Sequence, residues 1–449
     1  MCASVSTLVE EVRSIDPHQP EFHQAVEEVL ESIVPVVNAH EEYKTAEVLR
    51  RLLEPDRVVR FRVIWEDDEG QVHVNRGWRI QHTNALGPYK GGLRLHPAVN
   101  EGVLKFLAFE QTFKNALTGL PLGAGKGGSD FNPKGRSDRE VMRFCQAFMT
   151  QLWRYIGADT DVPAGDIGVG AREIGYLFGQ HKRLAGNWSG SMTGKATGMG
   201  GIHMRTEATG YGAVLFGAHA MEHVRSESLS GKRAAVSGAG NVALYAAEKL
   251  IAREVKVVTL SDSGGMLRIP GGLSQDDLET IREIKFSQRG RLEDVPAAVD
   301  GTEFVAGASP WSEDCELAFP CATQNELDEA DARALLKSGV QMVVEGANMP
   351  CTKEAIGLFR GSEVIFAPGK AANAGGVAVS GLEMAQNAGK NPWTRDRTEK
   401  ELESIMFDIH RRCVTEPTAK TADGIDYAHG ANVAGFRRVA DAMVAFGLV

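Results

Sequence analysis

The first part of the chain contains three lysines in polar, glycine-rich segments, Lys90, Lys114 and Lys126. Gln111 lies one helical turn before Lys114, so these two side chains share a helix face. A cleft that gathers ammonium groups suits a ligand with a carboxylate at each end. Crowding of like charges and exclusion of water lower the pKa of a lysine, so one member can be neutral near pH 7 and act as a base. The pattern therefore predicts a dicarboxylate site, with Lys126 as the base because its glycine neighbours allow close approach of a substrate.

Each lysine taken alone is equally compatible with a solvated turn residue. A phosphate-binding P-loop is ruled out at Lys126, because that motif requires Gly at position 120 and Ser or Thr at position 127, where the chain has Leu120 and Gly127. Asp166 lies in a glycine-rich loop over residues 161–170. Aspartate often caps a helix or forms a turn, but a carboxylate beside a neutral lysine can also shuttle protons. Asp166 is therefore the candidate proton-relay partner.

A second motif predicts a dinucleotide site. Gly238, Gly240 and Ala243 follow an expected strand over residues 232–237 and open an expected helix over residues 242–252. The first glycine permits a tight turn, the second lets the backbone approach a pyrophosphate, and the small third residue allows close helix packing, with the anion at the helix N-terminus. A tight strand-to-helix turn without a ligand is the alternative, and the neighbouring strands favour the dinucleotide.

The next strand predicts which dinucleotide binds. It ends at Ser261 and Asp262, near the distance at which an acidic residue would hold the 2′-hydroxyl of NAD. A serine hydroxyl accommodates a 2′-phosphate better than a carboxylate does, and Lys285 or Arg289 can balance the phosphate charge. This favours NADP, with NAD possible, although Lys285 and Arg289 also fit a solvated helix face.

Alternation of the hydrophobic pattern predicts the elements that position these residues. Before residue 203 we expect a helix over residues 22–33, which Pro35 interrupts or kinks, and two strands over 58–64 and 72–80 that form a hairpin. A helix over 103–117 follows. Ser137 and Glu140 then form a capping box at the start of a helix over 141–156. From about residue 205, strands over 232–237, 255–260, 340–344 and 364–366 alternate with helices, as in a doubly wound parallel sheet. The fold class is α/β with two domains.

Composition excludes several functions. The 449 residues carry 49 Lys plus Arg against 59 Asp plus Glu, a net charge of -10, which disfavours nucleic acid or an anionic membrane as partner. No apolar run reaches the length of a membrane span and no signal pattern occurs at the N-terminus, so a cytoplasmic location is expected. The six cysteines lack the spacing of a zinc site or a disulfide framework, which predicts no metal: Cys2, Cys145, Cys315, Cys321, Cys351 and Cys413.

Taken together, these segments resemble the hexameric glutamate dehydrogenases of the Glu/Leu/Phe/Val dehydrogenase family, specifically the small-subunit, mostly NADP-linked type. The resemblance covers nearly the whole chain and rests on residues 87–94, 109–118, 121–128, 161–170, 238–242, 320–327, 345–350 and 374–384.

The resemblance implies a role for each site residue. Lys126 would be catalytic and Asp166 its relay partner. The other substrate residues would be Lys90 and Ser380 for the side-chain carboxylate, Lys114 and Gln111 for the α-carboxylate, and Gly165 for the amino group. The cofactor residues would be Thr209, Gly238, Gly240, Asn241, Ser261, Lys285 and Asn348. Two departures, Ala124 and Val379, remove no functional group.

The resemblance also implies the domain division and the reaction. A substrate and oligomerisation domain would span residues 1–203, joined by a returning helix over 426–449, and a Rossmann NADP domain would span 204–425. The activity would be reversible, NADP-dependent conversion of L-glutamate to 2-oxoglutarate and ammonium by a homohexamer. The alternatives are an NAD-preferring or dual-cofactor enzyme, a branched-chain or aromatic amino-acid dehydrogenase of the same fold, and a nucleotide-sensing protein without catalysis.

Overall fold

The computed structural model describes residues 4–416 and 424–448, and its contacts divide the chain into two compact units. Unit 1 comprises Met1–His203, Val377–Thr398 and Asn432–Val449, and unit 2 comprises Met204–Gly376 and Glu399–Ala431. Unit 1 thus includes Val377–Thr398, a segment that falls in the second domain of the division implied by the resemblance. Both units mix helices with a sheet, so the expected two-domain α/β class is confirmed.

Unit 1 is built on a five-stranded mixed sheet with the order β1-β2-β4-β3-β5. Strand β2 is antiparallel to β1 and β4, whereas β3 is parallel to β4 and β5. Its strands are β1 (Arg57–Glu66), β2 (Val72–Thr83), β3 (Tyr89–Leu95), β4 (Ala124–Ser129) and β5 (Asp161–Gly165). Its first helices are α1 (Val5–Ile15), α2 (Pro20–Ala39), α3 (Glu41–Thr45), α4 (Val48–Leu53), α5 (Glu101–Leu117), α6 (Asp138–Leu152) and α7 (Ala171–Ala185).

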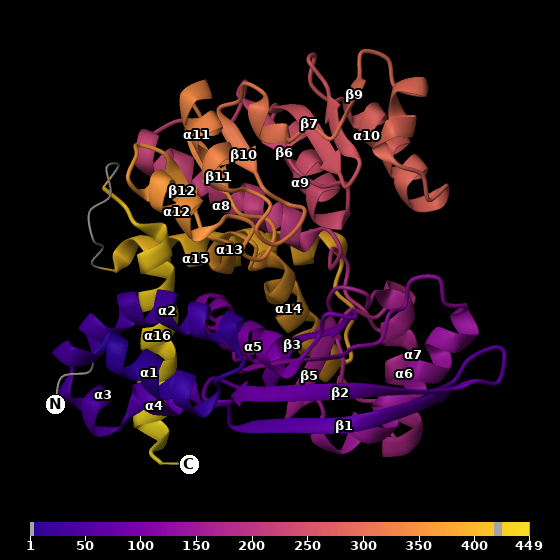
Figure 1. Cartoon of the computed structure of the whole chain (residues 1–449), viewed down its shortest axis with the longest axis vertical. Coiled ribbons are helices and arrows are strands. Elements are labelled where there is room, and N and C mark those ends of the chain that lie inside the picture. Colours follow the sequence, from indigo (N-terminus) through magenta and orange to yellow (C-terminus); the bar gives the residue numbers. More distant parts are fainter. Residues whose placement is uncertain (1–3, 417–423, 449) are drawn as a thin grey trace. The chain divides into compact units, whose positions relative to one another are not determined.

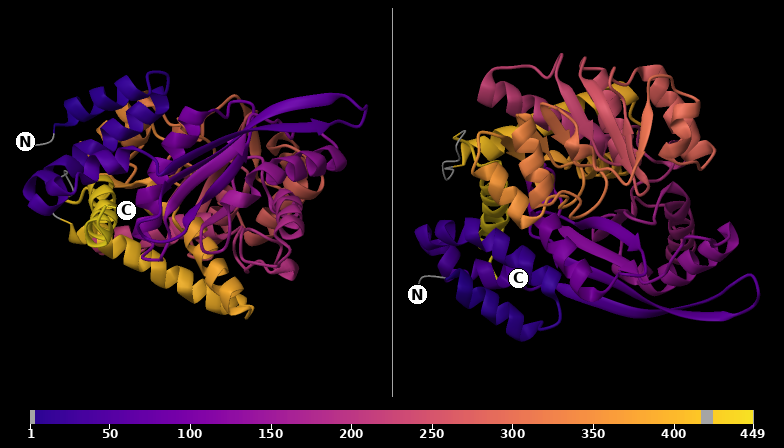
Figure 2. Two further views of the ribbon diagram at one scale, coloured as in Figure 1. Left: turned by 90° about the horizontal axis from the view of Figure 1, so that it is seen from below. Right: turned by 45° about the horizontal axis from the view of Figure 1, so that its top comes forward.

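Local sequence signals predicted some of these elements but not strands β3, β4 and β5, and one expectation needs correction. The expected hairpin is present as β1 and β2, which extend together in Figure 2. The capping box of α6 is also present, because Ser137 and Glu140 bond each other's backbone amides. The interruption expected at Pro35 is wrong, since α2 continues through this residue to Ala39. Pro35 is exposed while Val34 and Val37 are buried, so packing of the opposite face maintains the helix despite the missing amide hydrogen.

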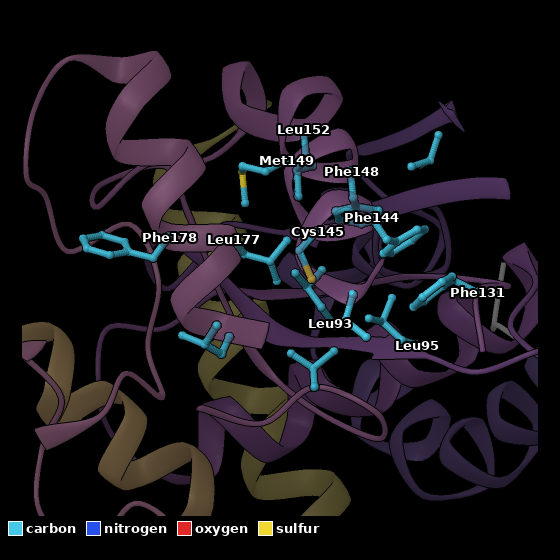
Figure 3. Close-up of a cluster of buried hydrophobic side chains, with 14 of the residues drawn as sticks. Leu93, Leu95, Phe131, Phe144, Cys145, Phe148, Met149, Leu152, Leu177 and Phe178 are labelled. Carbon is cyan, nitrogen blue, oxygen red and sulfur yellow. The ribbon is translucent and has the colours of Figure 1, made fainter. Parts of the chain in front are cut away.

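A hydrophobic core anchors strand β3 on one side. Leu93 and Leu95 pack with side chains of α6 and α7, including Phe144, Phe148 and Leu177, as Figure 3 shows. Burying a side chain of this size contributes about 1.5–3 kcal/mol. Successive residues of a strand point to opposite faces. Residues that alternate with Leu93 and Leu95 therefore face away from this core.

Unit 2 contains a seven-stranded sheet with the order β12-β11-β10-β6-β7-β8-β9. The first five strands in this order are parallel, and four of them were predicted. The sequence pattern predicted neither β10 nor β8 and β9, which extend the sheet in antiparallel pairing. Its strands are β6 (Arg233–Val236), β7 (Lys256–Asp262), β8 (Gly265–Arg268), β9 (Glu303–Ala306), β10 (Leu317–Phe319), β11 (Met342–Val344) and β12 (Ile365–Ala367). Its helices include α8 (Ala208–Arg225), α9 (Asn241–Ile251), α10 (Gln275–Arg282), α11 (Glu329–Ser338), α12 (Lys353–Arg360) and α13 (Gly369–Ala372).

Helices cover both faces of this sheet (Figure 1). On one face, Gly217 of α8 lies against Met342 and Val344. The residue between them, Val343, belongs to a core cluster with α11 and α12 residues such as Leu335. The alternation along β11 therefore buries both faces, which is the pattern of a doubly wound sheet.

Three last helices carry the chain between the units: α14 (Gly375–Gly389), α15 (Arg395–Thr415) and α16 (Tyr427–Phe446). Within unit 1, α16 lies beside the N-terminal helices in Figures 1 and 2. Asn432 donates a hydrogen bond to the Ser32 hydroxyl at 3.2 Å, and Tyr43 donates one to Asp441. The return of the final helix to the first domain, implied by the resemblance, is present.

Candidate functional site

Lys126, Arg94 and Asp166 form a bridged ion cluster in unit 1. The Lys126 Nζ atom donates a hydrogen bond to Asp166 Oδ1 at 2.9 Å, and the Arg94 Nε atom donates one to Asp166 Oδ2 at 2.6 Å. Lys126 lies on β4, Arg94 on the neighbouring β3, and Asp166 directly follows β5 on the other side of β3. Three adjacent strands thus place two cations around one carboxylate.

The surroundings change the protonation of this cluster. Burial lowers the pKa of Lys126, since the ammonium loses its hydration; the attraction of Asp166 opposes this, and the charge of Arg94 adds to it. Burial alone would raise the pKa of Asp166, but the charges of Lys126 and Arg94 outweigh it and hold that pKa well below its usual range. Lys126 therefore loses its proton more readily than a solvated lysine does, while Asp166 stays ionised.

Lys90 is completely buried, with 0% of its surface exposed. Its Nζ atom donates hydrogen bonds to the Val162 carbonyl oxygen at 3.0 Å and to the Thr193 hydroxyl at 2.8 Å. A buried ammonium is costly unless it is hydrogen-bonded. These two bonds help to hold the ammonium in place inside the fold.

Helix α5 presents Gln111 and Lys114 close to the same strands, and both side chains are half-buried. The neighbouring Asn115 ties the helix down, because its amide donates to the carbonyl oxygens of Lys90 at 3.0 Å and Gly123 at 2.6 Å. Gln111 donates to Asn115 at 2.5 Å. The predicted α-carboxylate residues therefore lie on a helix that is bonded to the backbone of Lys90.

Ser380 is buried on α14, in the part of this helix that belongs to unit 1. One turn later, Glu383 accepts hydrogen bonds from the Gly194 amide at 2.9 Å and the Lys195 Nζ atom at 2.8 Å. Thr193, which precedes Gly194, accepts a hydrogen bond from Lys90. A single short segment therefore connects the helix of Ser380 to Lys90.

Glycines allow the close approach of strands β3, β4 and β5. A Cβ atom at Gly92 would lie 2.7 Å from the Asp166 Cβ atom, and one at Gly91 would lie 1.7 Å from the Gly125 carbonyl oxygen. At Gly165 it would lie 2.4 Å from the Val169 carbonyl oxygen. Side chains are thus excluded where the backbones meet, and Gly165 is placed immediately before Asp166.

Sequence reasoning missed two residues of this site. Arg94 was given no role, although its position four residues after Lys90 on a strand indicates that the two share a face. Thr193 carries no sequence signal, because its loop is about a hundred residues away from Lys90 in the chain.

The dinucleotide motif of unit 2 has the geometry that it requires. Gly238 follows β6 with φ of +89°, a conformation that other residues rarely adopt. Gly240 precedes α9, and a Cβ atom there would meet nothing within 4 Å. Gly240 and Asn241 are exposed, and no side chain caps the first amides of α9. The turn therefore has open space beside free helix amides, which fits a pyrophosphate.

The residues predicted for the 2′-phosphate are partly engaged with one another. Ser261 is 8% exposed, and its hydroxyl accepts a hydrogen bond from the Gly238 amide at 3.0 Å. Lys285 pairs with Asp262 at 3.3 Å. Asp262 also accepts bonds from the Leu292 and Gly264 amides, which lower its pKa against the opposing effect of burial. The positive charge of Lys285 is thus partly balanced by a carboxylate.

Thr209 and Asn348 complete the predicted cofactor residues in unit 2. Thr209 lies in the first turn of α8, where its hydroxyl approaches Gly376. Asn348 is exposed in the segment after β11 and accepts a hydrogen bond from Asn373 at 3.2 Å. Asn348, Gly238 and Ser261 all lie toward the carboxyl ends of parallel strands, where open α/β sheets bind ligands.

The described residues contain no group of three or more His, Cys, Asp or Glu side chains that could hold a metal ion. Five cysteines are buried free thiols, namely Cys145, Cys315, Cys321, Cys351 and Cys413, and Cys2 lies outside the described residues. In the same described part of the chain, no helix combines the length and apolarity required to cross a bilayer.

Comparison with known families decides the kinship. The model of the Glutamate/Leucine/Phenylalanine/Valine dehydrogenase family matches residues 200–447, and that of the Glu/Leu/Phe/Val dehydrogenase dimerisation domain matches residues 55–183. The chain belongs to the Glu/Leu/Phe/Val dehydrogenase family. The dimerisation-domain match falls within unit 1, and the longer match includes all of unit 2 together with parts of unit 1.

Individual members of the Glu/Leu/Phe/Val dehydrogenase family match over the full length. The NADP-specific glutamate dehydrogenase of Psychrobacter sp. (strain TAD1) is 53% identical, over 99% of this chain and 100% of the relative. The NAD(P)-specific glutamate dehydrogenase of Xylanibacter ruminicola is 52% identical, over 98% and 99%. Among solved structures, Plasmodium falciparum glutamate dehydrogenase superposes with a TM-score of 0.96 at 47% identity, covering 99% of this chain and 95% of that one.

Proposed function

We propose that this chain catalyses the conversion of L-glutamate, water and NADP to 2-oxoglutarate, ammonium, NADPH and a proton, and the reverse reaction. The observation that carries the proposal is the burial of two lysines on adjacent strands, Lys90 on β3 and Lys126 on β4. Full-length relatives with this activity in their names support it.

Each end of a five-carbon diacid has a proposed partner. Lys90 and Ser380 hold the side-chain carboxylate, and Lys90 is suited to this because a buried ammonium is stabilised by an anionic partner. Gln111 and Lys114 hold the α-carboxylate, and the Gly165 backbone binds the amino group. Anchoring at both ends fixes the α-carbon and reduces the entropic cost of reaching the transition state.

Proton transfer is proposed for the Lys126 and Asp166 pair. Neutral Lys126 accepts a proton from the water that attacks the substrate iminium carbon, and it returns the proton during amination. Asp166 accepts a hydrogen bond from Lys126 throughout and passes protons to and from the substrate nitrogen without retaining them, because its own pKa is held low. These are proposed roles for residues whose contacts are described above.

A dinucleotide fits the residues of unit 2, since Gly240 leaves open space at the amides of α9. When bound, the nicotinamide accepts or supplies the hydride at the substrate α-carbon. Gly238, Gly240 and Asn241 would hold the pyrophosphate, with Thr209 and Asn348 nearby. Ser261 and Lys285 would hold the 2′-phosphate of NADP.

Use of NAD is the second candidate, because Asp262 occupies the position of a ribose-binding carboxylate and neutralises part of the Lys285 charge. The Xylanibacter ruminicola relative is named NAD(P)-specific. Steady-state rates with 2-oxoglutarate and ammonium, measured with NADPH and with NADH, separate these possibilities. A higher kcat/KM with NADH would reject the proposed preference.

Substrate choice is tested by comparing 2-oxoglutarate with 4-methyl-2-oxopentanoate, each with ammonium and NADPH. An apolar side chain would leave the buried Lys90 ammonium without an anionic partner, at a cost of about 1–3 kcal/mol or more. We expect turnover only with the diacid. Faster turnover of the branched substrate would instead support a branched-chain dehydrogenase, and cofactor binding without any turnover would support the nucleotide-sensing alternative.

A homohexamer in the cytoplasm, acting in ammonium assimilation, completes the proposal. The match of residues 55–183 to a dimerisation domain supports self-association. The hairpin in this range also exposes four large aliphatic side chains on one face, Val58, Ile64, Val72 and Val74. Light scattering of the purified chain tests the proposed assembly, and a monomer at micromolar concentration would contradict it.

A further inference from the structure

Arg94 is the least explained charged group of the Lys126 cluster. The proposed function gives a role to Lys126 and to Asp166 but leaves Arg94 without one. Its side chain is 14% exposed, and its Nε atom approaches Asp166 Oδ2 at 2.6 Å, closer than Lys126 approaches Oδ1. The carboxylate is therefore held on both oxygens by two different cations.

The fold fixes Arg94 more firmly than an ordinary surface arginine. Leu93 and Leu95, on either side of it, are buried in the core shown in Figure 3. Strand alternation then directs Arg94 to the opposite face. Gly92 occupies the preceding position on that face, and any side chain there would collide with Asp166. The glycine thus leaves room for Asp166 to lie against the strand and to be reached by Arg94.

We propose that Arg94 is a positioning residue whose guanidinium locks the Asp166 carboxylate in one orientation against Lys126, and thereby sets the pH range in which Lys126 exchanges protons. The inference rests on the proposed function of Lys126 as the base. Arg94 acts through Asp166, so it need not contact the substrate.

The charge of Arg94 and the planar geometry of its guanidinium contribute separately to the behaviour of Lys126 and Asp166, and two substitutions distinguish them. Arg94→Gln removes the positive charge, so the Lys126 ammonium is less destabilised by a neighbouring cation and gives up its proton at a higher pH. Arg94→Lys retains the charge but loses the planar donor group that fixes the carboxylate. The matched control is Arg143→Gln on α6 of the same unit, because Arg143 also binds a carboxylate, Asp68 at 2.7 Å, but away from the cluster.

The first measurement is the pH dependence of kcat and KM for L-glutamate with NADP. For Arg94→Gln we expect kcat to fall about 10-fold to 100-fold at neutral pH, as for a misplaced catalytic group. We also expect the acid limb of the profile, where kcat rises with pH, to move to higher pH, with little change in KM. Arg94→Lys should keep the limb near its original position with an intermediate kcat, and Arg143→Gln should behave like the unsubstituted protein.

The second measurement does not require turnover. Trace acetylation of Lys126 by acetic anhydride, quantified by peptide mass spectrometry across pH, reports the titration of that amine directly. We expect its midpoint to rise in Arg94→Gln and to stay near the original in Arg94→Lys and Arg143→Gln. If Arg94→Gln does not fold, Arg94→Lys supports the inference on its own, provided that its kcat is lowered while the acetylation midpoint of Lys126 is unchanged.

Two outcomes would overturn the inference. One is an unchanged Lys126 midpoint in Arg94→Gln, and the other is a kcat for Arg94→Lys equal to that of the unsubstituted protein. Absence of glutamate turnover in the unsubstituted protein would instead reject the proposed function, while the acetylation midpoints would still decide whether Arg94 controls the titration of Lys126.

Discussion

At the scale of single residues, the reactivity of Lys126 depends on what surrounds its ammonium group. The side chain is buried beside Arg94, which disfavours its charged form, and Asp166 opposes this effect. A lysine with this balance gives up its proton at a lower pH than a solvated lysine does. Rates of glutamate deamination should therefore rise with pH as Lys126 loses its proton.

The first prediction is that Lys126→Ala reduces kcat about 100-fold to 10,000-fold, the contribution usual for a general base. NADPH affinity should change less than about threefold, because the dinucleotide residues belong to unit 2. Fluorescence titration of NADPH and steady-state kinetics measure the two effects. Lys134→Ala serves as the control, since Lys134 is an exposed lysine of the same unit. Turnover that survives in Lys126→Ala would contradict the catalytic role.

The residue types of the cluster were predictable from the sequence, but its geometry was not. Glycines flanking Lys126 and Asp166 indicated close backbone approach, and the contact between these two side chains agrees with the expected pairing. Arg94 and Asp166 are separated by 72 positions, and only the parallel pairing of β3 with β5 brings them together. Such a register is set by tertiary packing and has no local sequence signal.

At the scale of elements, a buried ion pair joins strands β2 and β5 beneath the lysines. Arg79 donates two hydrogen bonds to Asp161, and neither side chain is exposed. Arg79 also donates to the Gly91 carbonyl oxygen at 3.2 Å, and its side chain lies against Gly127. The space that the glycines of β3 and β4 leave open is thus filled by one arginine from β2.

The second prediction concerns this pair. Arg79→Met should lower the free energy of unfolding by about 3–5 kcal/mol, because Asp161 would be left buried without its cation. The double variant Arg79→Met/Asp161→Leu should recover most of that loss, since replacing both ions by apolar groups is often neutral. Urea unfolding of both variants measures the difference. A double variant that is no more stable than the single one would show that the pair contributes through packing and not through charge.

Elements with strong local signals were predicted, and those defined by pairing were not. The alternation from β6 through α9 to β7 follows from hydrophobic periodicity and the glycine turn at Gly238. Strands β8 and β9 are only four residues each and carry no sustained alternation, so nothing local marked them. The interruption expected at Pro35 was wrong for a related reason. The buried face of α2 packs against residues distant in the sequence, and this packing outweighs the local helix-breaking tendency of proline.

At the scale of the whole molecule, each unit contains a buried histidine that resists protonation. In unit 1, burial lowers the pKa of His82 to about 4. Its Nε2 atom donates to the Leu52 carbonyl oxygen, and its Nδ1 atom has no hydrogen-bond partner among the described residues. In unit 2, burial, with His219 and His223 nearby, lowers the pKa of His410 to about 4. Protonation of either imidazole is disfavoured in the folded chain.

The third prediction is that stability falls with acid. The unfolded chain binds protons at these histidines near pH 6.5 and the folded chain only near pH 4, so their contribution is complete above pH 6.5 and is lost as pH falls toward 4. For fully buried His82 the loss is on the order of 3 kcal/mol. Urea midpoints between pH 8 and pH 4.5 measure it. His82→Gln should flatten this dependence, and an equally steep curve would contradict the assignment.

The division of unit 1 into three stretches of chain has a consequence for biosynthesis. Its last stretch, Asn432–Val449, supplies Asn432 to Ser32 and Asp441 to Tyr43. Every predicted catalytic residue is therefore synthesised well before the segment that completes this unit. Until α16 has been synthesised, the apolar surface of the first helices of the nascent chain is incompletely covered. Chaperone dependence of the growing polypeptide is expected to be greatest in that interval, and to decline once α16 can pack against those helices.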